Sequence, residues 1–180
     1  MLRRSPKSLM VRVAVLGAVC ACSSPDYSTS SNSTVVNGTI TATLSNYGPW
    51  IGQRTVTATN TNGALIIVGE DVNFKKITLF LVGVDINAAQ QNTPRTISIT
   101  PVVSDTVGYA ELRETFQTAV YVYNTFEGGH ASVTLTHVSA DRVAGTFDFL
   151  VQNWPTAAGQ GSRSATGGAF DIRPTIGTSQ

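Results

Sequence analysis

Hydrophobic and polar residues alternate with a period of two along most of the chain after Thr34. The run TITATL, for example, places Ile40, Ala42 and Leu44 on one face and threonines on the other. This alternation is typical of a half-buried β-strand, because successive side chains of a strand point to opposite faces. We count about eight or nine such short runs at roughly even spacing, at residues 39–44, 54–59, 64–69, 77–84, 96–100, 119–123, 130–139, 142–151 and 165–174.

Turn signals separate these runs. The sequence NTNG at residues 60–63 favours a tight turn, and Ala140 and Asp141 connect two long runs as a hairpin. Residues 77–84 are apolar on both faces, which is typical of a central strand buried on both sides. Residues 108–119 are the best candidate for a helical turn or a lid. We therefore predict one all-β domain over residues 34–180, an antiparallel β-sandwich or barrel-like sandwich.

The first 33 residues have a different character. A basic segment, residues 1–12, is followed by an apolar run from Val13 to Ala21. This run is far shorter than the ~20 residues that span a bilayer, so it predicts a cleaved signal peptide over residues 1–21. Residues 22–33 are polar, with almost nothing to bury, and predict a flexible tether.

The two cysteines, Cys20 and Cys22, lie at the end of this apolar run. A redox pair would have the spacing C-x-x-C, and a zinc site needs about four ligands, which the chain does not offer. The residues VCAC resemble a bacterial lipobox, and the resemblance implies diacylation of Cys22 and cleavage before it. Ser23 then favours export to the outer membrane of a Gram-negative cell. An ordinary signal peptide with unmodified thiols is the alternative.

Charge and composition restrict the partners. Charged residues make up 13% of the chain, about half of the ~25% usual for soluble domains. The net charge of +1 depends on four basic residues among the first twelve; without them, 8 basic residues face 11 acidic ones. A weakly acidic domain without a basic cluster is a poor partner for phosphate backbones. We expect a membrane partner through the lipid anchor, no nucleic acid and no cofactor.

Reactive residues form no recognisable catalytic pattern. No serine lies in G-x-S-x-G. His130 and His137 are an odd number of positions apart, so strand parity predicts opposite faces and no shared metal. Asp141, Asp148 and Asp171 are candidates for paired carboxylates of a glycosidase, but the sequence does not place two of them face to face. We therefore expect a non-enzymatic domain without catalytic residues or metal ligands, with an undetected hydrolase as the less favoured alternative.

Aromatic residues near strand ends offer a binding chemistry. Trp50, Tyr121, Tyr123 and Trp154 lie at such positions, where exposed rings stack on sugars in carbohydrate-binding modules. Large aromatic side chains are also usually mostly buried, so Trp50 and Trp154 as plugs of the core ends are the alternative.

Five segments resemble a family of small bacterial envelope lipoproteins with a β-rich domain of unknown function. The resemblance covers about Thr39 to Pro174 and is carried by TITATLSNYGPWIG, GALIIVG, ITLFL, YNTFEGGHASVTLTHVSADRVAGTFDFLV and TGGAFDI. In these motifs Gly145 and Gly168 allow close backbone approach or a bulge, while Phe147 and Phe170 pack. The resemblance implies an envelope lipoprotein and transfers no catalytic residue. The sequence thus predicts a lipid-anchored envelope protein with a structural or ligand-binding domain; its expected partner is a surface glycan or an envelope protein.

Overall fold

Strands make up most of the domain in the computed structural model. The structure describes residues 34–87, 93–101, 104–116, 119–126, 128–154 and 161–175. No helix in these ranges is long and apolar enough to cross a membrane. The all-β prediction is confirmed. The elements are β1 (Val35–Val36), β2 (Gly38–Leu44), β3 (Gly48–Ile51), β4 (Thr55–Thr61), β5 (Ala64–Glu70), β6 (Lys76–Val82), β7 (Arg95–Ile99), α1 (Ser104–Val107), β8 (Gly108–Phe116), β9 (Ala119–Asn124), β10 (His130–Val138), β11 (Val143–Trp154) and β12 (Ser162–Ile172).

The expected count of eight or nine strands is too low, since the described chain contains twelve. The nine alternating runs all form strands, and β1, β3 and β8 are additional. Strands β1 and β3 have two and four residues, which is too short for an alternation to be recognised.

The expected helical turn within residues 108–119 is wrong. Strand β8 occupies Gly108–Phe116 and pairs with both β6 and β9, while the one helical turn, α1, precedes it. Ala110, Leu112 and Glu114 are all buried on one face of β8. A glutamate in the buried phase of the pattern hides the period of two, because charged residues are seldom buried without a partner.

The strands form one mixed sheet. Its order is β1-β4-β5-β6-β8-β9-β11-β12-β2-β3, and β10 and β7 branch from β11. Every pairing is antiparallel except that of β1 with β4. Strand β11 connects the two halves because its residues 143–150 pair with β10, while Gln152 to Trp154 pair with β9.

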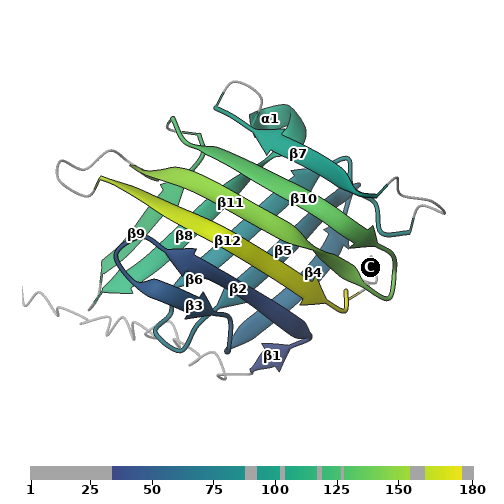
Figure 1. Cartoon of the computed structure of the whole chain (residues 1–180), viewed down its shortest axis with the longest axis horizontal. Coiled ribbons are helices and arrows are strands. Elements are labelled where there is room, and N and C mark those ends of the chain that lie inside the picture. Colours follow the sequence, from purple (N-terminus) through teal and green to yellow (C-terminus); the bar gives the residue numbers. More distant parts are fainter. Residues whose placement is uncertain are drawn as a thin grey trace, which may run out of the picture. The chain divides into compact units, whose positions relative to one another are not determined.

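The two halves of the sheet face each other. In Figure 1, β7, β10, β11, β12, β2 and β3 lie in front of β4, β5, β6 and β8, whose strands run across them. Side chains from both halves form one buried cluster, which includes Ile40, Leu65, Leu79, Phe147 and Phe170. Strand β6 is central, as expected, but its second face is largely half-buried; Phe80 on that face stacks on the ring of Tyr109 at 5.2 Å.

The expected turns are confirmed. Asn62 and Gly63 connect β4 and β5 with φ angles of 51° and 76°. Positive φ at both residues is the conformation of a tight hairpin turn whose twist matches that of the strands. In the β10–β11 hairpin, the amide of Ser139 donates to the carbonyl of Arg142 at 2.9 Å.

Two glycines let the core phenylalanines approach the backbone, as the motifs predict. A Cβ atom on Gly168 would lie 2.6 Å from Cζ of Phe147, and one on Gly145 would lie 2.7 Å from Cζ of Phe170. The pairing of β11 with β12 also shifts register between Phe147 and Phe149, beside Gly168. These glycines therefore shape the space that the rings of Phe147 and Phe170 fill.

Candidate functional site

A cavity of about 320 Å³ lies where several strand ends meet. Strand β8 supplies Glu114 and Phe116, β9 supplies Tyr121 and β12 supplies Arg163. The turn between β2 and β3 supplies Tyr47, and the connection before β6 supplies Lys75. We call it the Glu114–Arg163 cavity; its lining residues are Tyr47, Lys75, Glu114, Thr115, Phe116, Tyr121 and Arg163.

The cavity continues the hydrophobic face of the sheet. Leu112 pairs with Tyr123 and Glu114 pairs with Tyr121, so these four side chains share one face of β8 and β9. Leu112 and Tyr123 are fully buried in the core. Two residues further along this face, toward the strand ends, the charged Glu114 and the half-buried Tyr121 therefore follow the buried Leu112 and Tyr123.

A largely buried ion pair forms the centre of the cavity. Nε of Arg163 lies 3.2 Å from Oε1 of Glu114, and the two side chains are 14% and 7% exposed. The hydroxyl of Tyr47 donates to Oε2 of Glu114 at 3.2 Å. Burial raises the pKa of Tyr47, and the negative charge of Glu114 raises it further. Both oxygens of the carboxylate thus have a donor, as a buried charge requires.

The guanidinium of Arg163 also contacts Tyr123 and Ser162. Its carbon lies 4.6 Å from the ring centre of Tyr123, and Nη1 donates to the carbonyl of Ser162 at 3.1 Å. Burial lowers the pKa of Arg163, but the hydrogen bond and charge of Glu114 outweigh this effect and raise it overall. Arg163 is therefore held in the charged form by contacts on several sides.

The buried hydroxyl of Tyr123 has no hydrogen-bond partner in the described part of the chain. The residue is fully buried. Burial raises the pKa of its hydroxyl, and the charge of Glu114 adds to the increase. A buried hydroxyl without a partner costs free energy.

The aromatic residues that the sequence offers for sugar binding differ in their burial and in their position relative to the cavity. Tyr121 is half-buried and lines the cavity. Tyr123 is buried beneath Arg163, and Trp50 is 4% exposed and packs near Gly69. Trp50 is therefore a core plug and presents no face to a sugar. The side chain of Trp154 lies outside the described part of the structure.

Cys22 and the rest of residues 1–33 also lie outside the described residues. Six lining residues are absent from the predicted binding residues: Tyr47, Lys75, Glu114, Thr115, Phe116 and Arg163. The sequence signal for Glu114 and Arg163 is that each occupies the buried phase of a strand, in step with Leu112 and Ala165 respectively. Charges in that phase require a partner.

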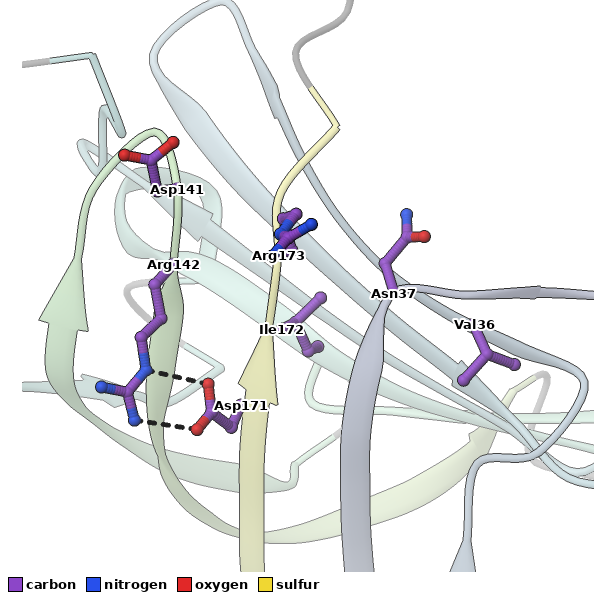
Figure 2. Close-up of a pocket in the computed structure, with 7 residues that line it drawn as sticks. All are labelled: Val36, Asn37, Asp141, Arg142, Asp171, Ile172 and Arg173. Atoms are coloured by element: carbon purple, nitrogen blue, oxygen red, sulfur yellow. Dashed lines mark hydrogen bonds and ion pairs between the residues drawn. The ribbon is translucent and has the colours of Figure 1, made fainter.

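A second depression, of about 440 Å³, lies at the other end of β12 and is shown in Figure 2. There Nε and Nη2 of Arg142 donate to the two carboxylate oxygens of Asp171 at 3.0 and 2.8 Å. The hydrogen bond from Arg142 lowers the pKa of Asp171. Both side chains are about half exposed, so this pair contributes little to stability.

The candidate carboxylates do not converge in the described structure. Figure 2 shows Asp141 turned away from Asp171, whose oxygens are occupied by Arg142. Asp148 accepts a hydrogen bond from the amide of Gly167 at 2.8 Å. A general acid and a second carboxylate across a common space are therefore not formed by these three residues.

The parity argument for the histidines is wrong. A bulge between Leu135 and His137 adds one residue to β10, so the alternation shifts, and both His130 and His137 are exposed. His137 contacts the hydroxyl of Ser139 at 3.2 Å. Among the described residues, no group of three or more histidine, cysteine or carboxylate side chains is arranged to hold a metal ion.

The Glu114–Arg163 cavity combines two chemistries within one small space. Its ion pair offers charged hydrogen-bonding groups, and the rings of Tyr47, Phe116 and Tyr121 offer apolar surfaces. Small-molecule sites have this mixture of a largely apolar lining and a few placed polar groups. Comparison of the chain with family models, curated proteins and solved structures finds no match.

Proposed function

We propose that this chain is a lipid-anchored protein of the cell envelope whose β domain binds a saccharide in the Glu114–Arg163 cavity and catalyses no reaction. The observation that carries the proposal is the largely buried Glu114–Arg163 pair, with three aromatic side chains around a cavity of about 320 Å³. That volume lies at the small end of the range of about 300–1,000 Å³ for small-molecule sites, which suits one or two sugar rings.

The lining fits a sugar on two sides. A pyranose has an apolar face of C–H groups and a rim of hydroxyls. Phe116 is 67% exposed and Tyr121 is half-buried, so ring surface is accessible to the C–H face. Hydroxyls of the sugar reach the remaining lone pairs of Glu114, whose carboxylate lines the cavity. Charge-assisted hydrogen bonds of this kind are stronger than those between neutral groups.

The depression of Figure 2 supports saccharide binding less well. Its lining includes no aromatic side chain, and its ion-paired charges, Arg142 and Asp171, neutralise each other while about half exposed. We therefore assign the binding function to the Glu114–Arg163 cavity. We also propose a sandwich as the description of the scaffold, supported by the two halves of the sheet that face each other across one core.

Saccharide binding is tested with an array of neutral, acidic and amino saccharides and the purified protein. We expect at least one class to bind and Phe116→Ala to weaken its binding about threefold to tenfold, the effect of losing one aromatic contact. Phe116 is largely exposed, so this substitution is not expected to unfold the domain. Phe126→Ala is the matched control, since Phe126 is an exposed phenylalanine that does not line the cavity.

An array on which no saccharide binds contradicts the proposal and favours a structural role. Binding that Phe116→Ala leaves unchanged contradicts the assignment to this cavity. Equal weakening by Phe116→Ala and Phe126→Ala would mean that exposed phenylalanines act non-specifically.

The membrane anchor is supported by the sequence at Cys22, which follows a basic segment, an apolar run and the residues VCA. Several acyl chains supply the membrane affinity that a single chain lacks. The proposal places the protein in the cell envelope, and at the outer membrane if the cell is Gram-negative.

Metabolic labelling with a fatty-acid probe tests the anchor. We expect the wild-type protein and Cys20→Ser to take up the label, and Cys22→Ser to take up none, because the lipid is attached to the Cys22 sulfur and amino group. Cys20→Ser is the control for loss of a neighbouring thiol. A Cys22→Ser protein that still incorporates the probe excludes the anchor.

A further inference from the structure

We infer that the ligand of the Glu114–Arg163 cavity is an acidic saccharide, one whose ring carries a carboxylate; this inference rests on the saccharide binding proposed above. The juxtaposition that carries it is the ammonium of Lys75 at the cavity wall beside exposed aromatic rings. The described lining contains two cations, Lys75 and Arg163, and one anion, Glu114. Because Arg163 is paired with Glu114, Lys75 is left as the uncompensated charge.

The ammonium of Lys75 has no carboxylate within ion-pair distance in the described structure. Its Nζ lies 4.3 Å from the ring centre of Tyr47. The same tyrosine donates its hydroxyl to Glu114, so one residue connects the cation to the buried pair. A cation that rests on a ring face keeps part of its charge available to an anion on its other side.

The backbone of Lys75 is fixed by a buried aspartate. Oδ1 of Asp71 accepts hydrogen bonds from the amides of Asn73 and Lys75, both at 2.8 Å. The amide of Asp71 in turn donates to the carbonyl of Lys75 at 3.0 Å. The turn that carries Lys75 is thus held by its own hydrogen bonds before β6 begins. Binding of a ligand therefore costs little conformational entropy for ordering this turn.

Glu114 does not oppose an acidic ligand strongly. One of its oxygens pairs with Arg163, and the other accepts from Tyr47. The negative charge of Glu114 is therefore compensated by its neighbours in the cavity wall. A carboxylate beside Lys75 meets the net positive charge of the lining, while the C–H face of its ring lies against Phe116 or Tyr121.

The inference is tested by calorimetric titration of the purified protein with matched oligosaccharides of glucose and glucuronate, galactose and galacturonate, and mannose and mannuronate. Each pair differs only in a hydroxymethyl or a carboxylate group on the ring. We expect at least one uronate to bind about fivefold more tightly than its neutral partner, the upper range for one exposed ion pair. The preference should decrease as salt concentration rises, because the pair is screened.

Lys75→Met should abolish the preference, so that the uronate and its neutral partner bind the variant with equal affinity. Lys76→Met is the matched control, since it removes the same charge from the next residue, which does not line the cavity. Acetate, a carboxylate without a ring, should not compete with the uronate.

The outcomes separate this inference from the proposed function. Three results would overturn the inference of an acidic ligand and leave the proposed saccharide binding intact. They are equal binding of the neutral and acidic partners, a preference that survives Lys75→Met, and competition by acetate. Binding of no oligosaccharide of either kind would overturn both.

Discussion

Replacing Arg163 with methionine is expected to lower the free energy of unfolding by about 3 kcal/mol. The substitution leaves the carboxylate of Glu114 in a site that is 7% exposed, without its cationic partner. Removing one partner of a buried ion pair typically costs about 3–5 kcal/mol, because the remaining charge is kept from water without an opposite charge to compensate its desolvation. We expect the low end because Tyr47 still donates to this carboxylate. Urea denaturation followed by circular dichroism measures the change.

The double variant Glu114→Leu with Arg163→Met is the control. Both charges are then absent, and apolar side chains of similar size extend the hydrophobic face that already includes Leu112 and Ala165. Such replacements of a whole buried pair are often neutral or stabilising. We therefore expect the double variant to be close to the wild type. A double variant as unstable as Arg163→Met would mean that Arg163 acts through its contact with Tyr123 and not through Glu114.

A wild-type stability for the double variant would also support a functional role for the pair. A charged pair that apolar residues can replace without loss is not required for folding. Its retention is then explained by what it binds in the cavity. Saccharide binding measured on the same double variant should accordingly be lost, although the domain remains folded.

Replacing Phe147 with alanine is expected to lower the free energy of unfolding by about 3–5 kcal/mol, as large-to-small core substitutions do. Phe147 is 1% exposed, and its ring lies 6.0 Å from that of Phe149 and 6.3 Å from that of Phe170. The cavity left behind cannot close readily, because Gly168 already brings the neighbouring strand as near as the ring permits. Chemical denaturation monitored by fluorescence measures the loss.

Phe126→Ala is the comparison for Phe147→Ala. Phe126 is 42% exposed and contacts the ring of Tyr109 at 5.3 Å. Its loss should cost at most about 1 kcal/mol, the contribution of one exposed aromatic pair. If the two alanine variants are equally stable, the ring of Phe147 does not fill the core as described.

The local pattern was sufficient for the strands that have one clean apolar face. Ile40, Ala42 and Leu44 alternate with threonines and form β2, and Asn62 with Gly63 forms the turn that their types favour. Alternation depends only on neighbours in the sequence, so it can be read without knowing the partners of a strand. The same reasoning is wrong for β8, where Glu114 takes a buried position, and for the histidines of β10, where a bulge shifts the phase.

The candidate site could not be assembled from the sequence because its residues come from distant segments. Tyr47 and Glu114 are 67 positions apart, and Glu114 and Arg163 are 49 positions apart. Which strand ends meet depends on the order β8-β9-β11-β12-β2, and no local pattern specifies that order. The aromatic residues Tyr121 and Tyr123 both lie in this region, but the sequence could not separate the half-buried ring from the fully buried one.

Local sequence patterns were enough to predict the all-β character of the domain, the positions of nine strands and two turns, and the packing roles of Gly145, Gly168, Phe147 and Phe170. These depend on side-chain periodicity and on backbone freedom, which are properties of neighbouring residues. Tertiary structure alone decided that Trp50 is a core plug and that Glu114 and Arg163 neutralise each other. It decided these because burial and pairing depend on which surfaces the folded sheet brings together, and that is fixed only when distant strands meet.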